Sequence, residues 1–369
     1  MSDSVVRYAV VGLGRAGWGI HVHQLRGRAD SRIVAVVDPV EARRNEAVAE
    51  FGCKAYTSLG KMLAQAADVD VVVVATPSAD HGRDTRKALK AGKHVVVEKP
   101  MATSLLEADS MIRTADEAGR KLFVHQNYRF YPEFLHLKEV VDSGLIGRLF
   151  HVRNYIAAFA RRNDWQTLAK NGGGQLNNTG VHFLDQILQL LPGAVTSVCG
   201  DLQQIASAGD VEDHVKAFMK TDAGATADME ISFVQNLATP LPKWILCGTH
   251  GTLTNDGDKS IVRWFDPKDA PPLDVIDGPA PDRKYGNDEK LPWQERTIEV
   301  AQRPHGAFYD HVNGVIAGRE AMRVTPESVR ETMRVLGMIR KSAKGPRTQN
   351  PKASAPSSRY SGERVGERG

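Results

Sequence analysis

The sequence predicts an α/β protein in which a doubly wound parallel sheet is followed by a second α/β domain with a mostly antiparallel sheet. Strands and helices alternate over the first 125 residues, and the runs 71–74 and 95–97 are wholly apolar, as in a parallel sheet covered on both faces. After residue 127 the pattern changes to a long succession of strands. A chain of 369 residues is long enough for two separate cores.

The elements of the first half follow from apolar runs bounded by turn residues. A glycine-rich turn after the first strand opens a helix that runs to about residue 26. The other helices are expected at 41–51, 59–66, 81–91 and 103–118, and the strands at 8–11, 33–37, 69–75, 94–97 and 121–125.

The second half begins with one helix and then consists mostly of strands. Helices are expected at 132–143, 176–191, 304–318 and 326–343, and strands at 149–156, 195–204, 213–221, 225–234, 243–247, 252–254, 260–265 and 296–301. The polar, Pro-rich stretch 266–294 is expected to be a surface insertion, because loops this long are uncommon in compact domains. We therefore divide the chain into domains 1–127 and 128–343 and a tail 344–369.

Composition and charge narrow the class of protein. Hydrophobic residues make up 41% and charged residues 25%, as in soluble globular proteins, and no apolar run is long enough to span a membrane. With no secretory signal visible and no metal-type spacing of the three cysteines, we expect a cytoplasmic protein with free thiols and no metal. The net charge is +4, but residues 341–369 carry seven basic and two acidic side chains and leave 1–340 at −1. We expect a solvated, disordered tail and no nucleic-acid or membrane partner; a nucleic-acid arm would have more aromatic residues than Tyr360.

The glycine-rich turn Gly12-x-Gly14-x-x-Gly17 is the first functional pattern. In a dinucleotide site such glycines allow a tight turn, close approach of the backbone to pyrophosphate, and helix–strand packing. Asp38 lies 21 residues after Gly17 at the end of the second strand, where a carboxylate accepts hydrogen bonds from an adenosine ribose. This favours NAD, although two following arginines leave NADP open; Asp38 is otherwise part of a plain Asp-Pro turn. The predicted cofactor contacts here are Gly12, Leu13, Gly14, Arg15, Ala16, Gly17 and Asp38.

The second pattern is Glu98-Lys99-Pro100, directly after the strand 94–97. Open parallel sheets bind ligands outside the carboxyl ends of their strands, so the Lys99 ammonium is expected beside the cofactor as a cationic proton donor. The alternative is a structural lysine paired with Glu98. At the same edge, His81 lies either near the cofactor or exposed at a helix N-terminus. The predicted cofactor contacts of this edge are Thr76, Pro77, His81, Glu98, Lys99 and Asn127.

Further motifs follow in the second half. They are Asn127-x-Arg129-Phe130, Gly172-Gly173-Gly174 and Gly180-x-His182-x-x-Asp185. Together with the two patterns above and Thr76-Pro77, they resemble the Gfo/Idh/MocA oxidoreductases over about residues 5–343. The resemblance implies an N-terminal Rossmann domain and a C-terminal α/β domain with one large open-faced sheet. It also implies NAD(P)-dependent oxidation or reduction of sugars, polyols and related compounds, by homodimers or homotetramers built through that sheet.

The resemblance also implies the catalytic positions. Lys99 lies near nicotinamide and substrate, and His182 is the histidine of the second motif, with an ordinary pKa of about 6.5 that suits proton transfer near neutrality. The family usually has an aspartate where this chain has Asn178, whose amide orients a hydroxyl but cannot take its proton. Asn178, His182 and Asp185 follow the spacing of one helix face. Asp185 then either accepts the second imidazole N–H and raises the basicity of His182, or makes a helix-surface or interdomain salt bridge.

Substrate recognition is expected where the two domains meet. The segment Arg161-Arg162-Asn163-Asp164-Trp165 precedes the glycine run and is expected on a loop over the site. Its arginines suit carboxylate or phosphate and Trp165 suits the face of a sugar, unless the segment only packs the loop. The predicted substrate contacts are Lys99, Tyr128, Arg129, Arg161, Trp165, Asn178 and His182, with Tyr155, Gln235 and Tyr309 as further candidates.

The leading hypothesis is an NAD-dependent oxidoreductase acting on a secondary hydroxyl or ketone of a sugar, polyol or derivative, with Lys99 and His182 handling the proton. A second is redox-neutral cleavage or elimination of a glycoside through a transient keto-sugar. A third is a ligand-sensing relative without turnover, against which the presence of both Lys99 and His182 argues.

Overall fold

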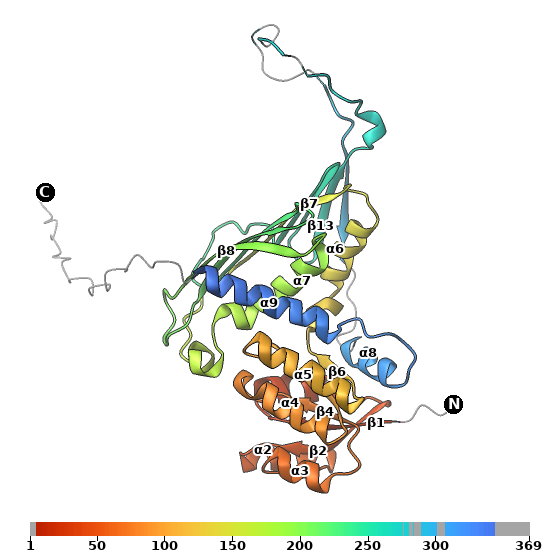
Figure 1. The fold of residues 1–369 in the computed structure, drawn as a ribbon, viewed down its shortest axis with the longest axis vertical. Coiled ribbons are helices and arrows are strands. Elements are labelled where there is room, and N and C mark those ends of the chain that lie inside the picture. Colours follow the sequence, from red (N-terminus) through yellow and green to blue (C-terminus); the bar gives the residue numbers. More distant parts are fainter. Residues whose placement is uncertain (1–4, 276, 280–282, 284–288, 301–306, 344–369) are drawn as a thin grey trace, which may run out of the picture.

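The N-terminal half of the molecule is a parallel sheet with helices on both faces (Figure 1). The computed structural model describes residues 5–275, 277–279, 283, 289–300 and 307–343. The sheet has the strand order β3-β2-β1-β4-β5-β6, which confirms the predicted doubly wound sheet. Its strands are β1 (Val6–Val11), β2 (Ser31–Val37), β3 (Lys54–Tyr56), β4 (Val71–Val74), β5 (His94–Val97) and β6 (Leu122–Val124).

The helices of this half begin and end where local residues cap them. Ser58 and Ser104 accept hydrogen bonds from backbone N–H groups of α3 and α5, and Gly52 and Gly119 end α2 and α5 in the left-handed conformation. The helix predicted after the glycine-rich turn instead begins as a π-helix, η1. The helices are η1 (Gly17–Val22), α1 (His23–Leu25), α2 (Glu41–Phe51), α3 (Leu59–Gln65), η2 (Ser78–Asp80), α4 (His81–Lys90) and α5 (Leu105–Ala118).

The second half is built on an eight-stranded sheet of order β14-β13-β12-β11-β7-β10-β9-β8. Only the β7–β10 pair is parallel, so the expected mostly antiparallel sheet is confirmed. Its strands are β7 (Leu149–Ala157), β8 (Val195–Gln203), β9 (His214–Thr221), β10 (Thr226–Ser232), β11 (Trp244–Gly248), β12 (Gly251–Asn255), β13 (Lys259–Trp264) and β14 (Gln294–Glu299).

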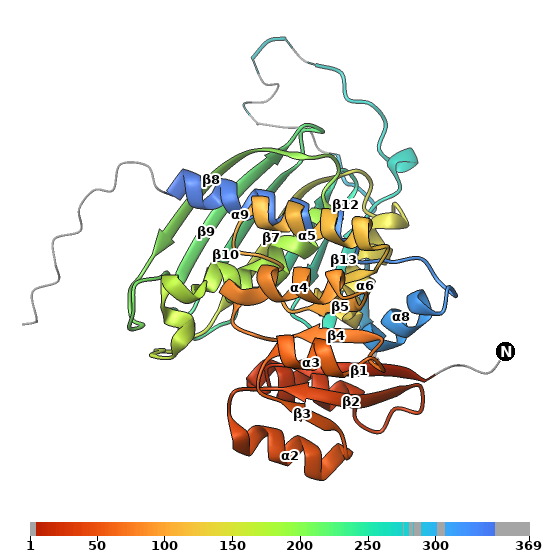
Figure 2. The same cartoon turned by 60° about the horizontal axis from the view of Figure 1, so that its bottom comes forward.

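Helices cover one face of this sheet, as Figures 1 and 2 show. A Cβ on Gly200 of β8 would lie 2.9 Å from the backbone oxygen of Ile339 in α9, so helix and strand backbones touch there. The helices and short turns are η3 (Asn127–Phe130), α6 (Pro132–Asp142), η4 (Trp165–Thr167), η5 (Ala169–Asn171), η6 (Leu176–Gly180), α7 (Val181–Leu190), η7 (Pro267–Asp269), α8 (Ala307–Ile316) and α9 (Pro326–Ala343). Between β13 and β14 the described part of the stretch 266–294 leaves the sheet as an arm, and the predicted tail 344–369 lies outside the described residues.

The chain returns to the first sheet near its end. In α8, the Asn313 side chain donates to the Ser31 hydroxyl at 2.8 Å, and the Tyr309 ring packs edge-on against Tyr8 of β1. The last segment of the chain therefore packs against the first sheet and joins the two halves. Within the described residues, no helix combines the length and apolarity needed to cross a bilayer.

Candidate active site

The glycine-rich turn after β1 is held by backbone packing and leaves one position open. Gly12 has φ +89°, and a Cβ there would lie 2.6 Å from the backbone oxygen of Ala75; a Cβ on Gly17 would lie 1.7 Å from the oxygen of Gly12. At Gly14 a Cβ would meet nothing within 4 Å. Glycine is therefore required at the first and third positions for packing, while the middle position presents backbone to open space, as a pyrophosphate site needs.

Asp38 ties the end of β2 to this turn. Its side chain is 2% exposed, and its two oxygens accept the Leu13 and Val40 backbone N–H groups, each at 2.8 Å. A carboxylate accepts about four hydrogen bonds, so sites for a ribose diol remain. Beside the turn, the Thr76 hydroxyl is buried and has no partner in the described part of the chain. These residues fit an NAD-type dinucleotide, with a pyrophosphate cradle and unused polar groups at the carboxyl edge of the sheet.

Lys99 reaches from the Rossmann domain to the second half of the molecule. Its Nζ donates to the backbone oxygen of Asn178 in η6 at 2.8 Å. Burial lowers the pKa of the Lys99 ammonium below its ordinary value; the Glu98 carboxylate opposes this, and Arg15 and Arg162 add to it. The structure thus brings the predicted amine to the predicted histidine-bearing element.

His182 lies at the start of α7, one turn beyond Asn178. Its ring stacks on Tyr128, with centroids 3.9 Å apart and planes at 12°, and Tyr128 stacks in turn on Tyr131 at 4.4 Å. The buried Nδ1 of His182 has no hydrogen-bond partner among the described residues. Burial, and then the charge of Lys99, hold the pKa of His182 well below its ordinary value. The imidazole is therefore neutral at physiological pH and keeps a lone pair for a proton.

The expected hydrogen bond from His182 to Asp185 is not formed. Asp185 accepts two hydrogen bonds of 2.6 Å from the Arg129 guanidinium and one of 2.8 Å from the Thr332 hydroxyl. A guanidinium fork matches a carboxylate in charge and geometry better than one imidazole N–H does. Asp185 does form a salt bridge, but a buried one within the second domain, and not the helix-surface or interdomain one expected as the alternative. It also engages Arg129, which is buried, donates to Ser328 as well and is therefore held by protein groups rather than free for substrate.

A pocket opens in front of Lys99. It is lined by Ser78, Lys99, Pro100, Trp165, Gln166, Gly172, Gly173, Asn177 and Asn178. Trp165 is 47% exposed at its rim, and the Gln166 amide donates to the Asn178 side-chain oxygen at 3.4 Å. Of the two loop arginines, Arg161 is exposed and donates to the Ala206 backbone, whereas Arg162 pairs with Asp164 and influences Lys99.

The remaining predicted residues lie as follows. His81 is buried, not exposed, and its ring nitrogens lie 2.8 and 2.9 Å from the backbone oxygens of Pro100 and Thr76, which joins the two cofactor-side loops. Asn127 donates to the Tyr131 hydroxyl at 3.2 Å. Outside the pocket lining, Tyr155 donates to Gln235 at 2.5 Å. The predicted cofactor contacts Arg15, Ala16 and Pro77 lie on the glycine-rich turn and the Thr76 loop.

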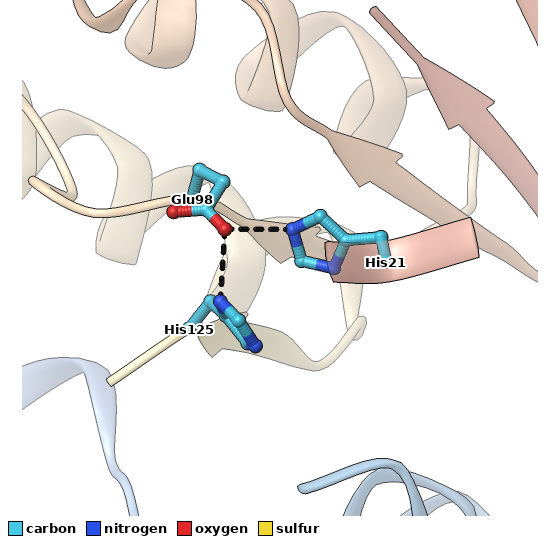
Figure 3. A group of neighbouring side chains, drawn as sticks. All are labelled: His21, Glu98 and His125. Atoms are coloured by element: carbon cyan, nitrogen blue, oxygen red, sulfur yellow. Dashed lines mark hydrogen bonds and ion pairs between the residues drawn. The ribbon is translucent and has the colours of Figure 1, made fainter. Parts of the chain in front are cut away.

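Sequence reasoning missed two residues behind Lys99, His21 and His125, and it placed Tyr309 among the substrate candidates although the Tyr309 hydroxyl lies 2.7 Å from His21 Nδ1. His21 and His125 each place a ring nitrogen 2.9 Å from the same oxygen of Glu98 (Figure 3). In the described residues, these three are the one group of His, Cys, Asp and Glu close enough to surround a metal ion. The Glu98 oxygen can accept a hydrogen bond from each histidine, so hydrogen bonding alone accounts for the arrangement of the three side chains. A histidine at the end of an apolar strand, as His125 is, was the signal available in the sequence.

Comparison with known proteins identifies the family of the chain. Residues 6–126 match the family described as "Oxidoreductase family, NAD-binding Rossmann fold", and residues 134–254 match the GFO/IDH/MocA C-terminal domain. The chain is 34% identical to a 1-carboxy-3-chloro-3,4-dihydroxycyclohexa-1,5-diene dehydrogenase of Comamonas testosteroni, over 62% of this chain and 58% of that one. It is 30% identical to the inositol 2-dehydrogenase of Rhizobium meliloti, over 60% and 67%. The crystal structure of an NAD-binding protein from Listeria innocua superposes with a TM-score of 0.76 at 26% identity, over 92% and 97% of the two chains. With its NAD-binding Rossmann domain and its second sheet, this chain is an enzyme of the Gfo/Idh/MocA oxidoreductase family.

Proposed function

We propose that the protein is an NAD-dependent dehydrogenase that oxidises a secondary hydroxyl of a ring-shaped polyol, sugar or related compound, and reduces the ketone in reverse. One observation carries this proposal. The Lys99 amine, from the carboxyl edge of the nucleotide-binding sheet, meets the Asn178 backbone of η6 at 2.8 Å, directly before the helix that carries the neutral His182. A charge donor that lines the pocket and a proton acceptor one helical turn beyond the lining residue Asn178 thus come from two domains.

Lys99, His182 and Asn178 have separate roles in the proposed oxidation of an alcohol. Bound nicotinamide supplies the hydride acceptor; the protein must position the carbinol and manage its proton. The Lys99 ammonium donates to the substrate oxygen and stabilises the negative charge that develops there. His182, kept neutral by burial, accepts the hydroxyl proton. Asn178 orients the hydroxyl through its amide, which the Gln166 amide faces at 3.4 Å, and takes no proton itself.

The lining of the pocket supports a neutral, hydroxyl-rich substrate. Apart from Lys99, its polar side chains are the amides of Gln166, Asn177 and Asn178 and the Ser78 hydroxyl, groups that both donate and accept hydrogen bonds. The guanidinium of Arg162, which suits an anionic substrate, is instead paired with Asp164 at 2.7 Å. The names of both curated relatives describe rings that bear hydroxyl groups, although the ring named for the Comamonas testosteroni enzyme also bears a carboxyl group. A cyclic polyol or sugar is therefore the substrate class that we favour.

The experiment is a substrate panel with the purified protein. NAD or NADP is supplied with inositols, pyranoses and cyclic diols, and reduced nicotinamide is followed by absorbance together with analysis of the organic product. We expect net NADH formation with a cyclic polyol or sugar, faster with NAD than with NADP. Product without net NADH would instead indicate redox-neutral chemistry, and saturable ligand binding with neither outcome would indicate a sensor; both contradict the proposal.

The uncovered face of the eight-stranded sheet supports the expected homo-oligomer. Helices pack on the face of Gly200 and Ala217, so Phe218, the neighbour of Ala217, points to the other side. Phe218 is 47% exposed and Ile261 38%, and both lie in one row of paired residues across the sheet. We propose that a second copy of the chain covers this face. Light scattering should give a dimer or tetramer for the wild type and a smaller species for Phe218→Asp; equal masses would contradict the proposal.

A further inference from the structure

A buried chain of polar side chains lies behind Lys99. It joins His21 of η1, Glu98 after β5 and His125 after β6, which Figure 3 shows, and continues from His21 to Tyr309 of α8. His21 Nε2 and His125 Nδ1 are each 2.9 Å from Glu98 Oε1, and Tyr309 Oη is 2.7 Å from His21 Nδ1. The second carboxylate oxygen, Oε2, accepts the backbone N–H of Lys99 at 3.0 Å. Four separate segments of the chain therefore converge on the residue that precedes the amine.

The contacts of Glu98 favour the charged form of its carboxylate. Burial alone would raise the pKa of Glu98, but His125 and His21 outweigh it and hold the pKa well below its ordinary value. An ionised carboxylate only accepts, so both facing ring nitrogens carry a hydrogen. Burial lowers the pKa of His21, whose other nitrogen is then a lone pair that accepts the Tyr309 hydroxyl hydrogen. A buried carboxylate is costly unless it is paired and hydrogen-bonded in this way.

Resting on the proposed function, we propose that His21, His125 and Tyr309 are positioning residues that hold Glu98 as a fixed counter-charge for Lys99. The network acts through two routes. Glu98 Oε2 fixes the backbone of Lys99 and so the origin of its side chain. The negative charge favours the ammonium form of an amine that burial would otherwise neutralise.

The charged groups around Lys99 determine in which direction its pKa moves when Glu98 is replaced. Burial, Arg15 and Arg162 all lower the pKa of Lys99, and Glu98 is the group that raises it. His182, whose pKa the charge of Lys99 helps to lower, is neutral and adds no charge. Replacing Glu98 by a neutral residue therefore leaves only lowering influences, and Lys99 loses its proton at a lower pH. In catalysis, the loss of activity on the alkaline side should move to lower pH by the same amount.

The test measures the amine directly and needs no substrate. The full chain is labelled with an amine-reactive anhydride at a series of pH values, and the modification of Lys99 is quantified by mass spectrometry of its peptide. Glu98→Gln should shift the midpoint of labelling down by about one pH unit or more, the size expected for a close charge. His125→Leu removes one donor and should shift it in the same direction by less. His125→Asn, whose amide can replace the Nδ1–H, should restore most of the wild-type midpoint, and thermal unfolding reports whether each variant folds.

Each result supports or overturns the inference. An unchanged midpoint in folded Glu98→Gln overturns it, and so does an identical shift for His125→Leu and His125→Asn. If His125→Leu fails to fold, Tyr309→Phe, which deletes only the hydroxyl donated to His21, takes its place and should shift the midpoint slightly down. One equivalent of zinc in the purified protein, lost in His125→Leu, would show these side chains to be ligands and also overturn it. Expected shifts without any dehydrogenase activity would contradict the proposed function alone.

Discussion

The two sides of the active site are held in different ways. On the Rossmann side, the loop that carries Lys99 is anchored through Glu98 to His21 and His125, and His81 bridges two loops at 2.8 and 2.9 Å. On the opposite side, His182 is held by a stacked ring and leaves a buried nitrogen without a partner in the described chain. The amine is thus positioned before any ligand arrives, whereas the imidazole keeps its hydrogen-bonding capacity for the ligand.

A π-helix lies on each side of the active site, and the two π-helices position different groups. The glycine-rich turn leads into the π-helix η1 and the glycine run into the π-helix η6, and π-helical turns are frequent at functional sites. In η1 the turn carries His21 into the buried network behind Glu98. In η6 it presents the backbone oxygen of Asn178 to Lys99. The π-helix η1 therefore supplies a hydrogen bond to Glu98, the residue before Lys99. The π-helix η6 supplies the backbone oxygen that accepts a hydrogen bond from the Lys99 amine.

The largest effect should come from the anchored side. Lys99→Met removes the charge that stabilises the substrate oxygen, and kcat/KM should fall about 10³–10⁴-fold. The dissociation constant of NAD, measured by fluorescence titration, should change only a few-fold, since the glycine-rich turn and Asp38 remain. Lys90→Met, at an exposed lysine on α4, is the matched control and should leave both values unchanged. Near-normal turnover in Lys99→Met would remove the amine from the chemistry.

The second effect concerns the buried salt bridge between Arg129 and Asp185, which anchors the helix that carries His182. Arg129→Met leaves Asp185 buried and without its bidentate partner, which should cost about 3–5 kcal/mol of the free energy of unfolding in urea. Arg113→Met, which breaks an exposed pair of 3.8 Å with Glu117, should cost less than about 1 kcal/mol. Equal losses in the two variants would mean that the buried pair does not stabilise the helix that carries His182.

Features that depend on neighbouring residues were predictable from the sequence, whereas contacts between distant residues were not. Apolar runs and strand–helix alternation predicted both sheets, because burial imposes those patterns locally. β3 went unpredicted, since it has only three residues, two of them exposed. The spacing of His182 and Asp185 placed them on one helix face, but no spacing could show that Arg129, 56 residues earlier in the chain, takes the carboxylate. A network assembled from four distant segments leaves no common pattern in the sequence, and its one local signal, a histidine after an apolar strand at His125, does not point to Glu98.

His182→Phe tests the ligand-facing side. A phenyl ring keeps the stack on Tyr128 but removes both nitrogens, so kcat for oxidation should fall about 10²–10³-fold. In the wild type, lowering the pH protonates the imidazole and removes the proton acceptor. Because the pKa of His182 is depressed, this fall in kcat should appear only below about pH 6.5, the ordinary value. An acid limb at or above that value would contradict a buried, neutral imidazole.

Asn178→Asp should shift the labelling midpoint of Lys99 in the direction opposite to the shift expected for Glu98→Gln. A carboxylate in front of Lys99 adds a second negative charge and raises its pKa, so the labelling midpoint of the amine should rise by about one pH unit. Asn163→Asp, at an exposed position of the loop, serves as the control and should leave the midpoint in place. A midpoint that does not rise would mean that the Asn178 side chain is directed away from the amine.

The smallest effect should come from the rim of the pocket. Trp165 is 47% exposed beside the pocket, so its indole can cover one face of a ring-shaped substrate without touching the reacting atoms. Trp165→Ala should therefore raise KM about three- to tenfold, near 1 kcal/mol, and leave kcat unchanged. Trp293→Ala removes an equally exposed indole, 49%, from the arm and should alter neither constant. A fall in kcat with an unchanged KM would mean that Trp165 orders the loop next to Asn178, and that the histidine side, too, is positioned before the substrate arrives.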